Sequence, residues 1–503
     1  MNNLAFAGTD GIIILSVYAI VMLAIGYLSG RGDKQLHDSL SGYYLAGKNL
    51  GFVALFFTLY ATQYSGNTIV GYAPSAYRIG FSWLQSVSFM TIIIGGYLLF
   101  APRLYVVSKK RNFVTPTDWI SYRFQSKPVT LLSIFLMLWG LGNYLLEQLV
   151  AIGHAVAGMT GGTIPYQIAV IAFVLVMLTY EWMGGMKAVA FTDVMQGGVM
   201  MVGIVVFLIG GLYLAGGDFS DVTRQIAEAE PIKTAVPAWD VSVNWLSMLL
   251  LVGLGASIYP HAVQRVYSAK SERTLKKSFA RMAWMPPITT GLVFLVGIIG
   301  IVLFPGLEKG ASEQLVGMMA NEIAAINSFY YWIMIMFFGG IVAAIVSTAD
   351  SVLLSFSSML SNDVYGKFIN PSATEHRKVV VGKIGGILVI MLLLWIAWNP
   401  PGTLYEIFVL KFELLVQVFP AFVLGLYWKR LNAKAVFWGM FAGALLAGIL
   451  TIAGYKTVYG VHGGVIGLAL NFVICITGSF LTSSTVPNHE KLEEDMNELE
   501  AKA

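Results

Sequence analysis

The stretch Ala343-Ala344-Ile345-Val346-Ser347-Thr348-Ala349-Asp350-Ser351-Val352-Leu353-Leu354-Ser355 places one carboxylate and four hydroxyls inside the apolar run 329–360. That run is longer than the roughly 20 residues that cross a bilayer. Most of its polar positions recur at spacings of three and four, so a helix would present them on one side. A carboxylate at membrane depth costs at least ~2.5 kcal/mol unless it is partnered. The stretch therefore predicts a dehydrated site for a hard cation. The plainer alternative is serines bonded to their own helix beside an aspartate that lines a watery vestibule.

The composition of the whole chain is that of a membrane protein. Hydrophobic residues make up 57% of the 503 residues and charged residues 12%, against about 25% charged in a soluble domain. Six His and one Cys leave no Cys/His metal framework and no disulfide pair. The net charge of +4 gives no sign of nucleic-acid binding. No nucleophile–base pair or nucleotide loop is recognisable, so we expect no enzyme, and the expected partner is the lipid bilayer.

Thirteen runs are apolar and long enough to span a bilayer, which predicts an all-α polytopic membrane protein of about thirteen helices. The runs are 11–29, 52–75, 81–102, 128–157, 166–183, 188–215, 243–264, 279–304, 329–360, 379–398, 402–426, 435–454 and 461–482. The first run lacks the flanks of a signal peptide and is expected to remain as a helix. We expect one membrane domain over 1–503 that functions as a monomer, with a solvated cytoplasmic tail over 487–503.

The loops between these runs alternate in charge. Those after the third, seventh, ninth and eleventh runs are rich in Lys and Arg, whereas the loops within 218–240 and 308–322 are acidic. Positive loops collect on the cytoplasmic side of a cell membrane. The N-terminus is therefore expected outside and the C-terminus in the cytoplasm, which agrees with an odd number of helices.

Two runs carry helix breakers at mid-depth. The second contains Ala61-Thr62-Gln63-Tyr64-Ser65-Gly66-Asn67-Thr68, and the seventh contains Gly253-Leu254-Gly255-Ala256-Ser257-Ile258-Tyr259-Pro260-His261. Non-helical backbone is tolerated in a membrane only where it lines a cavity. A matched pair of interrupted helices in two halves of a chain favours a transporter with its binding site between inverted repeats.

Four motifs make the sequence resemble the sodium:solute symporter family, nearest its pantothenate and monocarboxylate branch. They are Gly184-Gly185-Met186-Lys187-Ala188-Val189-Ala190-Phe191-Thr192-Asp193-Val194-Met195-Gln196, Pro260-His261 with Arg265, Ser347-Thr348-Ala349-Asp350-Ser351, and Leu424-Gly425-Leu426-Tyr427-Trp428-Lys429-Arg430. The resemblance implies a LeuT-type core of two inverted five-helix repeats, about 52–215 and 243–426. The helices 11–29, 435–454 and 461–482 would flank this core. It also implies sodium-coupled import of a small solute by alternating access.

The resemblance further implies the ligands of a sodium ion. These are the carbonyl oxygens of Ala61, Tyr64 and Ala344 and the hydroxyls of Ser347 and Thr348. Some members hold a second Na⁺, and the matching positions are Asp193, Ser347, Asp350 and Ser351. Those members have a hydroxyl where this chain has Asp350. The extra carboxylate could strengthen a second cation site or could carry a proton, and both interpretations stay open.

Family analogy places the substrate beside the two breaks. The candidate residues are Gln63, Asn67, Tyr144, Glu147, Ser257, Tyr259 and Lys411. Proline carriers of the family have an aspartate at the position of Gln63, and a tryptophan and a tyrosine at those of Val252 and Ala256. These departures favour a monocarboxylate or pantothenate-like solute over proline.

Lys411 is a cation inside the apolar run 402–426. It could receive the carboxylate of a substrate, or it could pair with Glu147 or Glu413 and only hold helices together. One Na⁺ at ~100 mV and a tenfold gradient supplies about 3.7 kcal/mol, which accumulates a neutral solute roughly 500-fold but a monovalent anion only about tenfold. A carboxylate carrier would therefore gain much from a second cation, which draws attention to Asp193 and Asp350. We expect a sodium-coupled symporter for a small carboxylate-bearing organic solute. The alternatives are a symporter for proline or another amino acid, and a proton-coupled carrier on the same fold in which Asp193 and Asp350 titrate.

Overall fold

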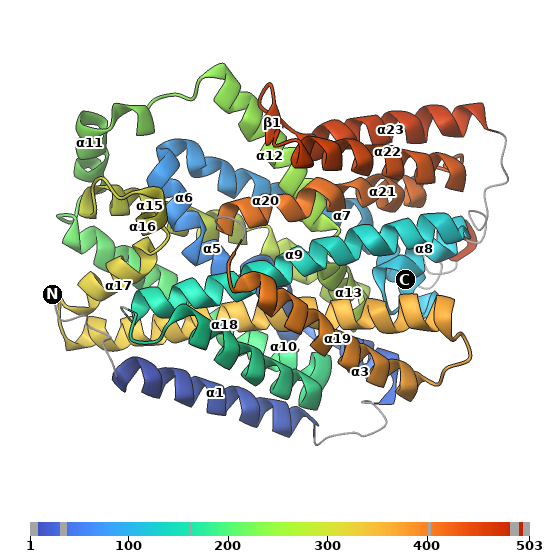
Figure 1. Cartoon of the computed structure of the whole chain (residues 1–503), viewed down its shortest axis with the longest axis horizontal. Coiled ribbons are helices and arrows are strands. Elements are labelled where there is room, and N and C mark those ends of the chain that lie inside the picture. Colours follow the sequence, from blue (N-terminus) through green and yellow to red (C-terminus); the bar gives the residue numbers. More distant parts are fainter. Residues whose placement is uncertain (1–8, 31–37, 161, 401–403, 483–491, 496–503) are drawn as a thin grey trace.

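The structure is a computed structural model that describes residues 9–30, 38–160, 162–400, 404–482 and 492–495. For residues 9, 30, 67, 158 and 159 it describes the backbone alone. Long helices run side by side along the longest axis of the molecule, with α1 (Thr9–Gly30) at one side and α22 (Ala433–Ile452) and α23 (Gly463–Leu481) at the other (Figure 1).

The other helices divide between the two halves of the chain. The first half holds α3 (Leu40–Leu45), α4 (Phe52–Gln63), α5 (Gly66–Val70), α6 (Tyr72–Ile79), α7 (Gln85–Arg111), α8 (Pro116–Phe124), α9 (Lys127–Met159), α10 (Tyr166–Leu214) and α11 (Phe219–Ala229). The second half holds α12 (Trp239–Ser257), α13 (Pro260–Ser268), α14 (Glu272–Met282), α15 (Gly291–Leu303), α16 (Lys309–Ser312), α17 (Leu315–Ala324), α18 (Ser328–Ser358), α19 (Glu375–Ala397), α20 (Leu404–Leu415) and α21 (Phe419–Tyr427). Short 3₁₀ segments are η1 (Ala46–Lys48), η2 (Gly80–Leu84), η3 (Pro231–Lys233) and η6 (Val416–Val418), and η4 (Pro286–Thr290) and η5 (Met359–Ile369) are π-helical. Strands β1 (Thr457–Val458) and β2 (Val461–His462) form an antiparallel hairpin.

Eleven helices within the described residues are long and apolar enough to cross a membrane. The difference from the thirteen expected runs has a local cause. The runs 166–183 and 188–215 form the single 49-residue helix α10, whose backbone leaves helical geometry at Gly185 (φ 52°, ψ −151°). A straight helix of that length would measure about 73 Å, more than twice the ~30 Å hydrocarbon core. The run 52–75 is divided among α4, α5 and α6, which are each too short to cross alone.

The polar stretch of the sequence lies at the centre of the bundle. Every residue of α18 from Ile341 to Ser358 is buried. The outer helices instead expose large apolar side chains, among them Ile13 of α1, Trp395 of α19 and Ile449 of α22. Apolar groups outside and oxygens inside are the arrangement expected of a bundle solvated by lipid.

The described part of the tail, residues 492–495, is docked, whereas the sequence predicted a solvated segment. Leu492 is 2% exposed and Asp495 is 1% exposed. The Asp495 carboxylate accepts hydrogen bonds from Arg111 Nε at 2.8 Å and Tyr122 Oη at 3.2 Å, and pairs with Lys110 Nζ at 2.7 Å. The expectation was wrong for Leu492 and Asp495, because the basic end of α7 and the adjacent α8 supply donors for a carboxylate, whereas Glu493 and Glu494 are exposed. The other residues of 487–503 lie outside the described part of the chain.

The Asp495 contacts predict a charge-dependent docking of the tail. Burial alone would raise the pKa, but the hydrogen bonds from Arg111 and Lys110 outweigh it and hold the pKa of Asp495 below its usual range. This stabilisation is present above the ordinary aspartate pKa of about 3.9 and is lost as pH falls through the lowered value. Docking is therefore expected to be constant between about pH 5 and pH 8.

Asp495→Asn should speed amide hydrogen exchange across 492–495 about tenfold at pH 7, because it removes a charged acceptor worth about 1.4 kcal/mol. Exchange measured by mass spectrometry tests this. Glu494→Gln is the matched control, since Glu494 belongs to the same segment but is exposed. Equal exchange rates in both variants would show that the ion pairs do not hold the tail.

Candidate functional site: buried oxygens and an ion pair at two broken helices

The first predicted break is confirmed. Helix α4 ends at Gln63, Tyr64 leaves helical geometry (φ −111°, ψ 87°), and α5 begins at Gly66. Gly66 packs so closely against α18 that a Cβ atom added there would overlap the side chain of Ile345. Glycine at this position lets the broken backbone approach the polar stretch of α18.

The break and α18 share a set of oxygens. Thr348 Oγ1 lies 3.0 Å from the carbonyl oxygen of Ala61 and 3.0 Å from that of Ala344, so its hydroxyl hydrogen is shared between them. Thr348 is fully buried. Thr348 therefore contacts two of the other four predicted sodium ligands. Tyr64 is the residue at the break itself, and the fifth ligand, Ser347, donates its hydroxyl to Asp193.

Asp193 is the centre of a second cluster. Its buried carboxylate accepts hydrogen bonds from Ser347 of α18 and from Thr58 of α4. Arg265 of α13 donates to Thr58 Oγ1 at 3.2 Å and to Ser351, and a third donor reaches the carbonyl oxygen of His261 at 2.9 Å. Four helices thus meet at one buried carboxylate and one buried guanidinium.

Thr58 and Arg265 are functional candidates that the sequence reasoning missed. Arg265 stood in the quoted Pro260-His261 motif, one helical turn after His261, but no role was assigned to it. Thr58 lies one turn before Thr62 on α4, so both residues were visible as polar positions on an apolar helix. A polar residue on an apolar helix indicates a buried polar face, but it does not predict which residue of a neighbouring helix it contacts.

Asp350 contacts a different group from Ser347 and Ser351. Its Oδ2 accepts the hydroxyl hydrogen of Tyr180 from α10, and its Oδ1 has no hydrogen-bond partner within the described residues. Ser347 and Ser351 are one turn apart and reach the Asp193–Arg265 cluster, whereas Asp350 is rotated about 100° from Ser351 on the helix. The structure therefore does not bring Asp350 into hydrogen-bond contact with the other members of the proposed second cation site.

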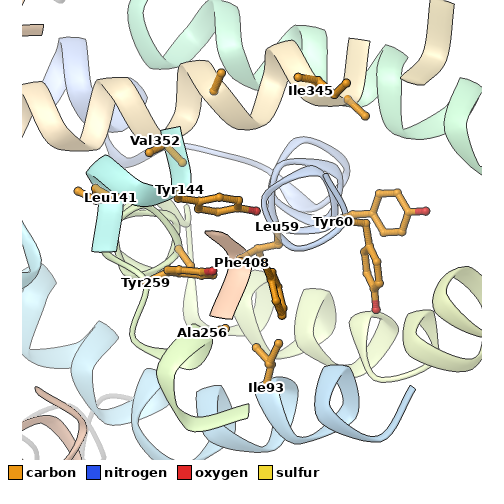
Figure 2. Packing of buried hydrophobic residues seen from close by; sticks show 14 of the residues in the cluster. Leu59, Tyr60, Ile93, Leu141, Tyr144, Ala256, Tyr259, Ile345, Val352 and Phe408 are labelled. Carbon is orange, nitrogen blue, oxygen red and sulfur yellow. The ribbon is translucent and has the colours of Figure 1, made fainter. Parts of the chain in front are cut away.

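The second predicted break is also confirmed. Helix α12 ends at Ser257, and α13 begins at Pro260 after Tyr259 (φ −50°, ψ 127°). Proline lacks the N–H that would continue the helix and is suited to its first position. The ring of Tyr259 stacks on that of Tyr144 with centroids 5.0 Å apart and an interplanar angle of 16°, as Figure 2 shows.

A small cavity lies beside both breaks. Its lining residues are Gln63, Ser65, Thr68, Tyr72, Met90, Ile93, Tyr144, Glu147, Val252, Ala256, Tyr259, Phe408, Lys411 and Phe412. Its volume of about 20 Å³ is room for a single water molecule. An organic solute could enter only if the surrounding side chains moved apart.

Five of the seven predicted substrate residues line this cavity, namely Gln63, Tyr144, Glu147, Tyr259 and Lys411. Ser257 does not, because it packs against α7 and donates its hydroxyl to the carbonyl oxygen of Leu254 at 2.7 Å. The side chain of Asn67 lies outside the described part of the structure.

Lys411 forms a buried ion pair with Glu147. The exposed fraction is 1% for Lys411 and 0% for Glu147. The alternative partner, Glu413, instead lies 3.1 Å from His462 Nδ1 and accepts the backbone N–H of Gly464 at the start of α23. Breaking a buried pair by removing one partner typically costs about 3–5 kcal/mol, so this pair constrains whatever enters the cavity.

A helical membrane bundle whose paired broken helices enclose buried oxygens and an ion pair has the architecture of a secondary transporter. The model of the sodium:solute symporter family matches residues 43–443, and the chain belongs to this family. Its members are transporters and not enzymes.

The chain is similar along nearly its whole length to characterised relatives. It is 27% identical over 495 residues to the sodium/pantothenate symporter of Escherichia coli, covering 96% of this chain and 99% of that protein. It is 28% identical over 464 residues to sodium/proline symporter 2 of Staphylococcus saprophyticus, covering 89% and 87%. The solved substrate-bound, outward-open state of a Na⁺-coupled sialic acid symporter has a TM-score of 0.77 at 18% identity, covering 95% of this chain and 98% of that one. The last similarity shows the fold of the chain.

Proposed function

We propose that this chain is a sodium-coupled symporter that imports a small carboxylate-bearing solute across the cell (inner) membrane by alternating access. The observation that carries the proposal is the contact of Thr348 with Ala61 and Ala344. A broken helix and an intact helix there contribute three oxygens to one buried point. Neutral oxygens of this kind suit a hard monovalent cation, since carbonyl groups can replace its hydration shell.

The proposed ligands of Na⁺ are Ala61, Tyr64, Ala344, Ser347 and Thr348. Thr348 now uses its hydrogen to bridge two carbonyl groups. A bound cation would take the lone pairs of the same three oxygens and would leave that hydrogen free to turn away. Because Thr348 and Ala61 belong to different helices, Na⁺ would tie α4 to α18, which links ion binding to helix arrangement.

A second cation site at Asp193, Asp350 and Ser351 remains a proposal. The hydrogen bonds of these residues limit how such a site could form. Asp193 and Ser347 are adjacent, but Ser351 is bonded to the guanidinium of Arg265 and Asp350 to Tyr180. A second Na⁺ would therefore need Arg265 or Asp350 to change partners. One Na⁺ per cycle is the simpler stoichiometry.

The proposed topology has the N-terminus outside, thirteen crossings and two inverted repeats, about 52–215 and 243–426. Helix α1 begins at the end of the bundle that carries α17, and α23 finishes at the opposite end, which is the end that carries α8 (Figure 1). Ends on opposite sides support an odd number of crossings. The bend at Gly185 would supply one additional crossing, and the combined segment α4–α6 would supply the other.

The proposed substrate binds where Lys411 lines the cavity, with Gln63, Tyr144 and Tyr259 around it. Lys411 is the group that would receive a carboxylate. Monocarboxylates, pantothenate-like acids, proline and other amino acids all belong to this class, and pantothenate and proline are named for the relatives above.

A thermal-shift experiment on the purified protein tests the proposal. Na⁺ replacing K⁺ at constant ionic strength should raise the unfolding temperature, and a transported carboxylate should raise it further only with Na⁺ present, because ligands stabilise the state they bind. Proteoliposomes with an inward Na⁺ gradient should accumulate the same solute. If Na⁺ changes neither the unfolding temperature nor the uptake, and uptake depends instead on a pH gradient, sodium coupling is contradicted and the proton-coupled carrier is favoured.

A further inference from the structure

The cavity beside the breaks contains two charged side chains among its described lining residues, Glu147 and Lys411, and they neutralise each other. Glu147 comes from α9 and Lys411 from α20, so the pair joins two helices. The other lining groups are neutral amides, hydroxyls, apolar chains and aromatic rings. A solute that enters must therefore either leave the pair intact or exchange partners with it.

The charge of the solute decides the cost of that exchange. A monoanion that binds Lys411 separates Glu147 from its ion-pair partner and leaves a net negative charge in a site with almost no exposure to water. A zwitterion offers a carboxylate to Lys411 and a cationic nitrogen to Glu147, so both buried charges stay compensated. The site is thus complementary to a solute that carries both signs.

The aromatic lining supports a cationic nitrogen as well. Lys411 Nζ lies 3.7 Å from the centroid of the Tyr144 ring, 4.6 Å from that of Phe408 and 5.1 Å from that of Phe412. The ring of Tyr259 is 5.6 Å from Lys411 Nζ, and Figure 2 shows Tyr144, Tyr259 and Phe408 in the same part of the core. Ring faces within about 6 Å attract a cation, and desolvation strengthens the attraction. These rings already hold one ammonium group and could hold that of a solute beside Glu147.

We propose that Glu147 and Lys411 form an exchangeable ion pair that selects zwitterionic solutes, such as amino acids and betaines, over monocarboxylates of the same shape. The inference rests on the proposed function and narrows its substrate class. It also fits the coupling energy: one Na⁺ with a zwitterion moves net charge, so the membrane voltage contributes, whereas one Na⁺ with a monoanion is electroneutral.

Matched pairs of solutes test the charge preference directly. Proline is compared with cyclopentanecarboxylate, β-alanine with butyrate, and glycine betaine with 3,3-dimethylbutanoate, each pair differing mainly in the cationic nitrogen. Dissociation constants are measured by thermal shift in Na⁺ on the full-length protein. We expect at least one zwitterion to bind ten times more tightly than its isostere.

Two variants separate a selective role from a merely structural one. Glu147→Gln keeps Lys411 and should reverse the preference toward monocarboxylates. Glu147→Gln/Lys411→Met removes both charges, tests whether the protein folds without the pair, and should abolish the preference. Stabilisation by Na⁺ alone is recorded for every variant as the measure of an intact sodium site.

Each result decides between the two proposals. If Na⁺ stabilises the protein but the monocarboxylates bind as tightly as the zwitterions, or if no solute of the set binds, the exchangeable pair is overturned and sodium coupling stands. A loss of binding in Glu147→Gln that is equal for both members of a pair also overturns it. If Na⁺ has no effect on the wild-type protein, it is the proposed function that fails.

Discussion

Thr348→Val is expected to remove most of the dependence of stability and uptake on Na⁺. Valine keeps the shape of threonine but lacks the oxygen that contacts the carbonyl groups of Ala61 and Ala344. A hydrogen-bonding group that contacts a charge contributes about 1.5–3 kcal/mol. The Na⁺ concentration for half-maximal stabilisation should therefore rise about 10–100-fold.

Sodium titrations of wild type and variant, read by thermal shift and by uptake, measure this change. Thr91→Val is the matched control, because Thr91 is exposed on α7 and donates its hydroxyl to its own helix at Val87. Thr348→Val also removes the hydrogen bond between α18 and α4. The unfolding temperature without Na⁺ measures that effect alone, so the further change on adding Na⁺ reports ion binding. An unchanged half-maximal concentration in Thr348→Val would remove Thr348 from the sodium site.

The sequence predicted the positions of the breaks well because their causes are local. Gly66 and Pro260 act on their own backbone, so the ends of α4 and α12 could be predicted to within a few residues. The approach of Thr348 to Ala61 also followed from the family resemblance. Eleven helices in the described residues are long and apolar enough to cross a membrane, against thirteen expected runs. The difference arises because two runs continue as one helix through Gly185 and because the run 52–75 is divided among α4, α5 and α6.

Apart from the approach of Thr348 to Ala61, the contacts between helices were not predicted. Asp350 and Ser351 are neighbours in sequence and were both candidates for one cation site, but their partners are Tyr180 and Arg265 on different helices. Spacing along one helix gives the direction of a side chain, whereas its partner depends on how the helices pack. The pairing of Lys411 with Glu147 was similarly one of two open alternatives before the packing was known.

The Asp193–Arg265 cluster gives the second large expected effect. Arg265→Met should destabilise the protein by up to about 3–5 kcal/mol, the cost of breaking a direct buried ion pair. The buried Asp193 loses the guanidinium that reaches it through Thr58, and Ser351 and the carbonyl oxygen of His261 lose a donor. Asp193→Asn/Arg265→Met removes both charges and should recover a large part of this loss. The unfolding temperatures of the wild type, Asp193→Asn, Arg265→Met and the double variant are compared in detergent without Na⁺. This comparison measures the coupling free energy between Asp193 and Arg265.

The same variants show whether Arg265 stands where a cation could otherwise bind. In Arg265→Met, Asp193 and Ser347 still offer oxygens, and Ser351 loses the donor that now occupies its hydroxyl. High Na⁺ should therefore stabilise Arg265→Met more than it stabilises the wild type, and this gain should be absent from the double variant. An equal gain in wild type, single variant and double variant would mean that the guanidinium does not compete with a cation at Asp193. Under the proposed function, competition by Arg265 would mean that a second cation can couple to transport only when the guanidinium moves away from Thr58 and Ser351.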